Sequence, residues 1–301
     1  MKNALVERLQ LERTLVTVKS IPFPNGVPLP DGRDEKSDAP QDYTERLRIF
    51  TNEVANCMNI SRQYGGSRAP TTKHFFASAL FTSIVTRAVS LTFLLPYSEW
   101  SQRAFEHWDY ASAANIARTI METRLNFFYL CVDECSEVEW DCRWNLFNLH
   151  DAMARVALMR VTDNHDQERG LTTQAAELRT KLNSDAFFKL IPEKRRKELL
   201  KGNTAHLCSL EEIRSRAGLD LRTFKLMWKF MSAHVHALPL SFYRMRDNER
   251  GRGVQTPVEE AYTKLTISFA LVLLVGAREE YVRLVESAGP LERMVSYKPN
   301  A

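Results

Sequence analysis

Two histidines, His234 and His236, stand two residues apart near the end of an apolar stretch, FMSAHVHALPLSF. Such imidazoles can serve as metal ligands or as catalytic bases. On a helix, a spacing of two residues corresponds to about 200° of rotation, so the two rings point to nearly opposite faces and cannot both bind one metal ion. We therefore predict no metal site. His234 is expected in the core, and His236 in a polar network at the helix end, on the same face as Ser232. Ser232 and His236 also suit a nucleophile and its base, but no third group or oxyanion signal completes that arrangement.

Charged side chains interrupt several apolar segments. Arg118 and Glu122 lie one helical turn apart, and similar positions hold Arg87, Arg143, His150 and Arg155. Charges in apolar surroundings are costly unless they are paired, so one interpretation is a buried salt-bridge network that fixes helix register. The other interpretation is a polar pocket in the bundle. In that pocket the catalytic candidates are Glu122, His236 and His150, and the anion-binding candidates are Arg87, Arg118, Arg143, Arg155 and Ser232.

Several enzyme classes lack their motifs in this sequence. A carboxylate-bridged di-metal bundle needs Glu-x-x-His pairs, and the chain has none. Neither the Gly-x-x-x-x-Gly-Lys-Ser/Thr nor the Gly-x-Gly-x-x-Gly phosphate loop is present, which excludes the ATP-driven and dinucleotide-binding classes that use them. The five cysteines show no zinc-ligand spacing and are expected to be reduced thiols. We expect no cofactor.

The elements that must position these residues are predicted to be helices, because alternating strand patterns are nearly absent. Capping boxes are predicted at Ser136–Glu139, Ser209–Glu212 and Thr256–Glu259, and Asp109 and Asp220 are expected N-caps. Residues 21–41 hold five prolines and should form an extended arm, and residues 163–171 are predicted to be a loop. The predicted helices are 2–19, 43–64, 73–95, 110–132, 137–161, 173–183, 192–200, 209–217, 220–237 and 256–287.

Two short motifs suggest nucleic-acid chemistry. The spacing of Arg160 and His165 resembles the Arg-x4-His motif of HEPN-type ribonucleases, which are helical and need no metal. Residues 209–230 resemble a helix-turn-helix, with Arg222, Thr223 and Lys225 at the start of the recognition helix. That helix continues as LMWKFMSAHVHAL, which is too apolar for an exposed groove-binding helix, so an ordinary corner between two helices is the better interpretation.

Three longer segments resemble a widespread group of uncharacterised bacterial helical proteins that is catalogued as a domain of unknown function. These segments are WDYASAANIARTIMET, EVEWDCRWNLFNLHDAMAR and FMSAHVHALPLSFYRM, within a resemblance that spans about residues 75–285. It rests on Arg118, Glu122, His150, Ser232, His236 and Pro239. The resemblance implies an all-α fold and supports interest in these polar residues. Some members of such groups are suspected of roles in phage defence, which is an association and not a mechanism.

The sequence as a whole predicts an all-α, multi-helix bundle with a Pro-rich N-terminal arm. Residues 1–41 form the N-terminal helix and arm, and residues 42–301 form the bundle domain. The N-terminus lacks the apolar core of a signal peptide, so the protein is expected in the cytoplasm and not in a membrane. The arm would suit exchange with a second subunit, which predicts a homodimer.

Two functions remain open at this point. The first is a binding or interaction module in which the inner charges are structural. The second is a metal-independent ribonuclease, or another nucleic-acid-directed enzyme, that uses an Arg/Glu/His pocket. In the second case Arg246, Arg250 and Arg252 would contact phosphates. The net charge of +4 is weak evidence for a polyanionic partner.

Overall fold

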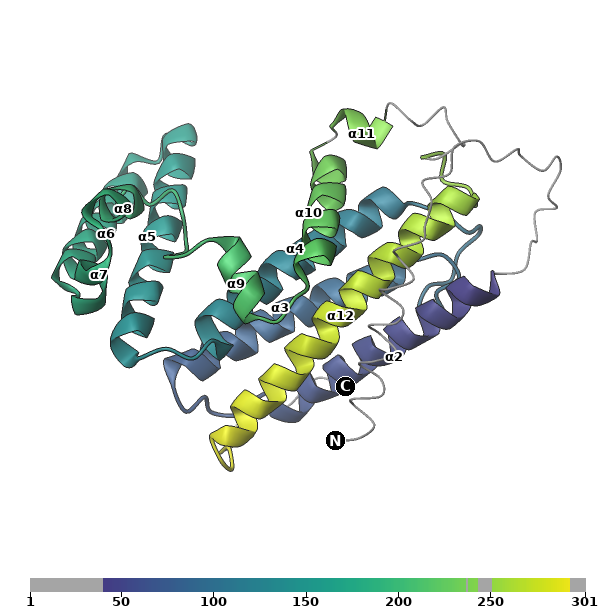
Figure 1. Cartoon of the computed structure of the whole chain (residues 1–301), viewed down its shortest axis with the longest axis horizontal. Coiled ribbons are helices and arrows are strands. Elements are labelled where there is room, and N and C mark those ends of the chain that lie inside the picture. The colour runs from purple at the N-terminus through teal and green to yellow at the C-terminus, as the bar shows by residue number, and fades with distance from the viewer. Residues whose placement is uncertain (1–39, 237, 243–250, 293–301) are drawn as a thin grey trace. The chain divides into compact units, whose positions relative to one another are not determined.

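The computed structural model describes residues 40–236, 238–242 and 251–292 (Figure 1). Within these residues the regular structure is helical, and the one isolated β-bridge joins Trp108 to Gly253. The all-α prediction is therefore confirmed. The predicted helix 2–19 and residues 21–39 of the Pro-rich arm lie outside the described residues. Gln41, the last residue of the predicted arm, is already helical, and the domain boundary predicted after it stays a prediction.

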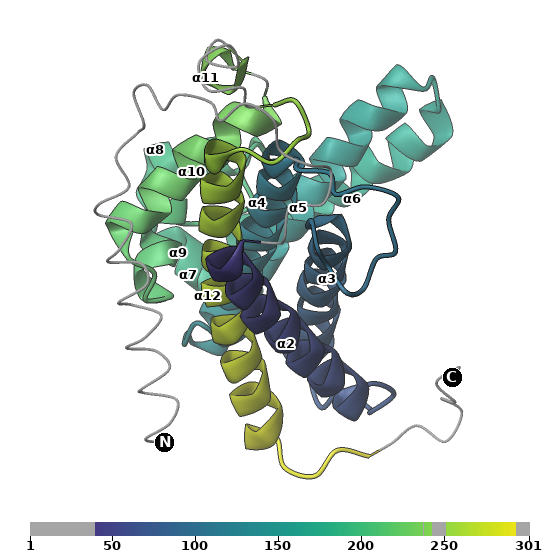
Figure 2. The same cartoon turned by 90° about the vertical axis from the view of Figure 1, so that its right-hand side faces the viewer.

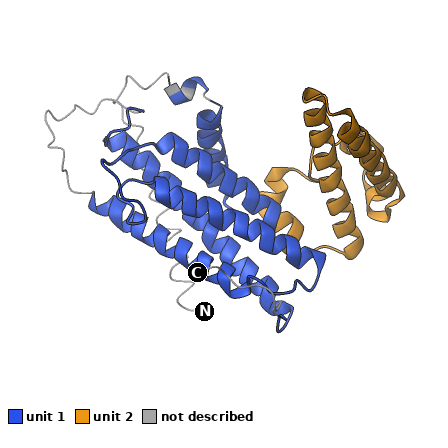
Figure 3. Ribbon diagram, turned by 180° about the vertical axis from the view of Figure 1, so that it is seen from behind, with its two compact units in different colours: residues 1–127, 219–301 blue, residues 128–218 orange. Residues whose placement is uncertain are grey.

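The chain divides into two compact units (Figure 3). Unit 1 comprises residues 1–127 and 219–301, and unit 2 comprises residues 128–218. Unit 2 therefore interrupts unit 1 in the sequence, between the helix that ends at Phe127 and the helix that begins at Leu221. Each unit has its own buried side chains and is described separately below.

Unit 1 is a bundle of long helices in which α12 is the central element. This helix packs against α2, α3 and α4, and α10 packs against α4 (Figures 1 and 2). Because α12 has neighbours on several sides, apolar residues occupy most of its surface and include Ile267, Phe269 and Leu273. The described helices of unit 1 are α2 (Gln41–Tyr64), α3 (Thr72–Leu94), α4 (Tyr110–Phe127), α10 (Leu221–Val235), α11 (Pro239–Phe242) and α12 (Pro257–Ser287).

Two of these helices, α3 and α12, are long and apolar enough to cross a membrane when judged by length and composition alone. This is weak evidence, because buried helices of bundle cores pass the same test. In α12, 56% of the most apolar window is buried within the structure, whereas in α3 the share is 39%. These values show that α12 is the more enclosed of the two.

A buried ion pair joins α4 to α12. Arg124 is 2% exposed, and its Nη2 contacts Oε1 of Glu280 at 2.5 Å. A Cβ at position 276 would lie 3.3 Å from Nη2 of Arg124, so Gly276 leaves the space that this guanidinium occupies. Burial raises the pKa of the Glu280 carboxyl, while the charge of Arg124 acts in the opposite direction.

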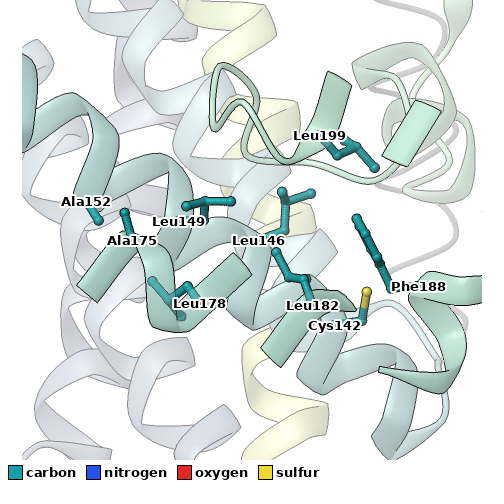
Figure 4. Packing of buried hydrophobic residues seen from close by; sticks show 9 residues of the cluster. All are labelled: Cys142, Leu146, Leu149, Ala152, Ala175, Leu178, Leu182, Phe188 and Leu199. Carbon is teal, nitrogen blue, oxygen red and sulfur yellow. The ribbon is translucent and has the colours of Figure 1, made fainter. Parts of the chain in front are cut away.

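Unit 2 is a smaller helical assembly built on α5. This helix packs against α6 and α7 around an apolar cluster that includes Leu146, Leu149, Leu182 and Phe188 (Figure 4). The described elements of unit 2 are the π-helical turn η2 (Phe128–Val132), α5 (Glu137–Val161), α6 (His165–Ser184), α7 (Ala186–Leu190), α8 (Glu193–Leu199) and α9 (Leu210–Arg216).

The predicted loop at residues 163–171 is wrong, because α6 already begins at His165. The side chain of Asn164 caps this helix by accepting a hydrogen bond from the backbone N–H of Gln167, at 3.2 Å. The first buried residue of α6 is Leu171, so its first turns are polar and carry no apolar periodicity. The polar composition of residues 163–170 therefore marks an exposed helix start, and not a loop.

Candidate functional site

Three of the predicted site residues meet in unit 1, where α4 packs against α10. Arg118 donates to Glu122 through Nε, at 2.8 Å, and through Nη1 to the hydroxyl of Ser232. Its guanidinium carbon lies 3.5 Å from the ring centroid of Trp228, and Nη1 also donates to the Trp228 carbonyl at 3.3 Å. Arg118 is thus stacked and hydrogen-bonded between two helices, as expected of a residue that fixes their register.

The other predicted residues of unit 1 lie outside this cluster. Arg87 is half-buried and donates to the carbonyl of Ser83 on its own helix, at 2.9 Å. His236 is the exposed C-cap of α10, and its backbone N–H bonds to the Ser232 carbonyl. The structure therefore brings Arg118, Glu122 and Ser232 together in unit 1 but not Arg87.

Arg143 belongs to unit 2, where it holds the π-helical turn. It is 1% exposed and donates to the Tyr129 carbonyl at 2.7 Å, and its guanidinium lies over the Tyr129 ring. It forms ion pairs with Glu139 at 2.6 Å and with Asp133 at 2.8 Å. A π-turn leaves carbonyl groups without their usual helical donors, and Arg143 supplies one of those donors.

The remaining predicted residues of unit 2 have separate surroundings. The Nδ1 atom of His150 donates to the carbonyl of Gly202 at 2.9 Å, and Arg155 is exposed beside Asp151. His206 is a half-buried imidazole that was not predicted. Desolvation, with a smaller contribution from His150, lowers the pKa of His206 to about 4.

The residues predicted to contact or cleave nucleic acid are either exposed or outside the described residues. Arg246 and Arg250 lie outside the described residues, and Arg252 is exposed. Arg160 and His165, which carry the HEPN-like spacing, both lie at the surface of unit 2 and contact the carboxylate of Glu168, at 2.6 and 3.6 Å. Glu168 is thus a shared partner of this pair, and the Arg160 guanidinium holds the pKa of its carboxyl below the usual value.

A cavity of about 320 Å³ lies in unit 1, where the N-terminal ends of α4 and α12 meet the C-terminal end of α10. Its size falls in the range of small-molecule sites. We call it the end pocket, and define it by its lining residues His107, Trp108, Asp109, Tyr110, Ala111, His234, Ser241, Gly251, Arg252, Gly253 and Glu259.

One wall of the end pocket is a Gly-Arg-Gly segment held by two hydrogen bonds. The Trp108 backbone N–H donates to the Gly253 carbonyl at 3.1 Å, and the Gly251 N–H donates to the carboxylate of Glu259. Both glycines have positive φ, 75° at Gly251 and 78° at Gly253, a conformation that favours glycine. The segment thereby presents Arg252 at the pocket.

His234 lies on another wall and has a defined tautomer. Its Nδ1 atom is 2.7 Å from the carbonyl oxygen of Phe230, which can only accept, so the neutral ring carries its proton on Nδ1. The Tyr110 ring meets the imidazole edge to face, with 5.1 Å between centroids. The nitrogen that can accept a proton is therefore Nε2.

The two carboxylates of the pocket occupy helix N-termini. Asp109 accepts from the backbone N–H of Ser112 at 3.0 Å, and Glu259 lies in the first turn of α12. The positive end of each helix dipole offsets part of their charge. Arg252, His107 and His234 are the other side chains of the pocket that can carry charge.

Trp108 lines the same pocket and also carries a buried donor. This residue is 1% exposed, and among the described residues its indole N–H has no hydrogen-bond partner. Buried donors are nearly always satisfied in folded proteins, because an unmade bond costs about 1–3 kcal/mol.

The described residues contain no group of three or more His, Cys, Asp or Glu side chains arranged to hold a metal ion. Arg252 can bind an anion, and the imidazoles of His107 and His234 line the same pocket.

Sequence reasoning identified only part of this pocket. Arg252 was predicted as a phosphate contact, and His234 was assigned to the core, whereas His107 and Trp108 were not predicted. The segment 107–111 lies more than a hundred residues before the other two contributing segments, 234–241 and 251–259. The only local signal for His107 was its position just before the N-cap Asp109, and that signal does not separate a pocket residue from a loop residue.

The described residues thus form an all-helical protein with a cavity at one end of unit 1. The chain belongs to the family of unknown function DUF5677, whose sequence profile matches residues 74–253. This confirms the resemblance to a family of unknown function. The match ends at the Gly-Arg-Gly segment, before α12, and it gives no support to the HEPN-type similarity. No curated protein and no solved structure matches the chain.

Proposed function

We propose that the protein is a binding module that takes a small oxyanion ligand in the end pocket. The observation that carries this proposal is that Arg252 and Trp108 line one cavity, and that the buried indole N–H of Trp108 has no partner among the described residues. Donors gathered at one cavity suit a ligand rich in acceptor oxygens, such as a phosphate ester. In this reading the inner Arg118 and Arg143 clusters are structural.

The test is a titration with inorganic phosphate and, separately, with adenosine monophosphate. The ¹⁵N–¹H indole resonance of Trp108 is monitored by NMR at each step. The resonance is assigned with the Trp108→Phe variant. We expect a saturable shift that Arg252→Gln weakens at least tenfold. Arg155→Gln is the matched control, because Arg155 is also exposed but belongs to unit 2. A Trp108 resonance that does not move at millimolar phosphate would contradict the proposal.

A second candidate is metal-independent cleavage of RNA in the same pocket, and the presence of two imidazoles there favours it. One imidazole would take the proton of the ribose 2′-hydroxyl as that oxygen attacks phosphorus. The other would protonate the departing 5′-oxygen, which yields a 2′,3′-cyclic phosphate and a 5′-hydroxyl. His234 suits the base, because its Nε2 atom is the acceptor nitrogen in the neutral ring.

This candidate is tested by incubating RNA with the protein in excess EDTA. Cleavage that His107→Gln and His234→Gln each reduce at least a hundredfold would support it. The exposed histidine His165 provides the control variant, His165→Gln. RNA left intact by protein that still binds phosphate would limit the function to binding.

Three expectations from the sequence complete the proposal: a role in phage defence, a cytoplasmic location and a homodimer formed through residues 1–41. The defence role follows only from the family resemblance and is tested by plaque counts with and without the expressed chain. Light scattering after size-exclusion chromatography tests the dimer, and a monomeric mass for the full chain would overturn it.

A further inference from the structure

The helix α5 of unit 2 has apolar residues on two opposite faces. One face carries the buried cluster around Leu146 and Leu149, and α6, α7 and α8 all lie on that side of the helix (Figure 1). At 100° per residue, a second apolar row runs about 180° away from this cluster. The second row, which we call the outer stripe, consists of Trp140, Trp144, Phe147, Ala154, Leu158 and Val161. A helix that is covered on one face needs only one apolar row, so the outer stripe indicates an interface.

The N-terminal half of the outer stripe is aromatic, and its rings lie in order along the helix. The ring planes of Trp140 and Trp144 differ by 7°, with 5.8 Å between centroids. Those of Trp144 and Phe147 differ by 13°, with 6.2 Å between centroids. All three residues are half-buried, and the indole N–H of Trp140 donates to the Leu130 carbonyl at 2.8 Å. These contacts hold the rings in place, so this part of the interface is already formed in the single chain.

The C-terminal half of the outer stripe is aliphatic and open to solvent. Leu158 is 57% exposed and Val161 is 82% exposed, and Ala154 is exposed as well. Between the two halves, Asp151 and Arg155 form an exposed ion pair at 3.6 Å. Along the helix the stripe therefore presents aromatic rings, then two opposite charges, then aliphatic side chains.

This order makes the outer stripe complementary to itself. When two copies of α5 pack antiparallel, with the two-fold axis between positions 151 and 155, Asp151 of each copy faces Arg155 of the other. Phe147 then lies opposite Leu158 of the second copy, and the tryptophans lie toward its aliphatic end. A parallel pair would instead bring the two Asp151 carboxylates together. The arrangement of the stripe therefore selects a second copy in the antiparallel orientation.

We propose that the protein forms a homodimer in which the outer stripes of two α5 helices pack antiparallel. The segment that pairs, from Trp144 to Val161, is about 26 Å long. Because one pair of helices is a small interface, we expect a dissociation constant in the micromolar range. This interface does not use residues 1–41, through which the sequence predicts a dimer, and it does not depend on the end pocket.

The position of Asp151 argues against a lipid surface as the partner. A helix that binds a membrane inserts its apolar face into the boundary between headgroups and acyl chains. At 100° per residue, Asp151 lies within about 20° of the line that joins Trp140 to Leu158, so its carboxylate would be carried into the lipid. A charge is costly in that environment. In the dimer the same carboxylate meets a guanidinium.

The test uses two single charge reversals in the full chain, Asp151→Arg and Arg155→Asp. In a dimer of either variant, like charges face each other across the two-fold axis, so each variant should dimerise at least tenfold more weakly than the unaltered chain. An equimolar mixture should dimerise like the unaltered chain, because one copy then contributes only arginines and the other only aspartates. Light scattering after size-exclusion chromatography, across micromolar to millimolar protein, gives the masses. Energy transfer between dyes at the two N-termini detects the mixed dimer.

A second pair of variants tests the apolar part of the interface. Leu158→Lys should weaken dimerisation at least tenfold, because it places a charge against the aromatic half of the second copy. The control is Leu190→Lys, which adds the same charge at an exposed leucine of α7 and should stay within twofold. Both leucines are exposed, so both variants should fold. Equal urea midpoints, measured below the dissociation constant, would verify this.

Three outcomes would overturn the proposal. A monomeric mass for the unaltered chain at every concentration would exclude this dimer together with one formed through residues 1–41. A dimer that persists unchanged in Leu158→Lys and in both charge reversals would place the interface elsewhere. Reversals that weaken the dimer, but that do not restore it when mixed, would show that Asp151 and Arg155 do not meet across a two-fold axis.

Discussion

The imidazole of His107 lies directly against the backbone of Gly253. A Cβ built on this glycine would be 2.5 Å from Cε1 of His107, and its φ of 78° is one that other residues adopt with strain. Gly253→Ala should therefore displace the His107 ring and weaken phosphate binding at least tenfold. It should also cost about 1–2 kcal/mol of stability for the backbone conformation.

The control for this variant is Gly289→Ala. Gly289 has a φ of 77° and no atom within 4 Å of its Cβ position, so it shares the backbone strain but not the contact. Titration calorimetry with phosphate and urea unfolding measure both effects. Equal phosphate affinities in the two variants would show that the contact between His107 and Gly253 does not affect phosphate binding.

Arg118 offers a way to separate a structural role from a binding role. Arg118→Ala removes the stacking on Trp228 and the hydrogen bonds to Glu122 and Ser232, and it should lower the free energy of unfolding by about 2–4 kcal/mol. Arg118→Lys should recover less than half of this loss, because an ammonium group cannot reproduce the planar contacts. Urea unfolding measures the effect.

The same variants test whether Arg118 binds an anion, as the pocket interpretation of the sequence holds. Protein that remains folded should bind phosphate with unchanged affinity, since Arg118 does not line the end pocket. Full stability together with lost phosphate binding would reverse the assignment and favour the pocket interpretation.

The ion pair between Arg124 and Glu280 should be costly to break from one side. Glu280→Leu leaves a guanidinium that is 2% exposed without its carboxylate, which should destabilise unit 1 by about 3–5 kcal/mol. Replacing both partners, as Arg124→Met/Glu280→Leu, should recover most of the loss, because no charge is then buried. Urea unfolding of both proteins tests this, and a double variant no more stable than the single one would contradict it.

His206 should make unit 2 sensitive to mild acid. Its pKa is about 4 in the folded protein, against an ordinary value of 6.5. As the pH falls from about 6.5 toward 4, the unfolded chain binds a proton that the folded chain excludes, so the free energy of unfolding decreases. The full loss is on the order of 3 kcal/mol.

The check is urea unfolding of the unaltered chain and of His206→Gln at pH 7.0 and 5.0. The stability difference between the two pH values should be smaller in the variant. His165→Gln, which changes an exposed histidine, should behave like the unaltered chain. If all three proteins respond equally to pH, His206 does not determine the acid sensitivity.

The sequence predicted most helix boundaries because the signals for them are local. Helix α5 has the predicted bounds, Glu137–Val161, and the side chain of Ser136 caps it as expected. The full reciprocal capping box forms at Ser209 and Glu212. At the other two predicted boxes the hydroxyl caps the helix, but the carboxylates of Glu139 and Glu259 bind Arg143 and the Gly251 N–H. Those partners depend on tertiary structure, which a local motif does not contain.

The candidate site was harder to predict for the same reason. Buried charges such as Arg118 and Arg143 stand out in a sequence, because they interrupt apolar periodicity, and the structure places both in interhelical or turn contacts. The residues of the end pocket do not stand out in the sequence in this way. Its residues come from short connecting segments in which His107 and Arg252 resemble ordinary loop residues, and only the packing of α4, α10 and α12 brings them together.

The interruption of unit 1 by unit 2 constrains the order in which the chain folds during synthesis. Residues 128–218 leave the ribosome as one continuous segment, and they hold the whole apolar cluster around Leu146 and Phe188. Unit 1 has to wait for α12, which is both its central helix and the last helix described. Translation proceeds at roughly 5–20 residues per second, so α2, α3 and α4 spend several seconds with apolar faces uncovered. These early helices are the part of the nascent protein that a chaperone would have most reason to hold.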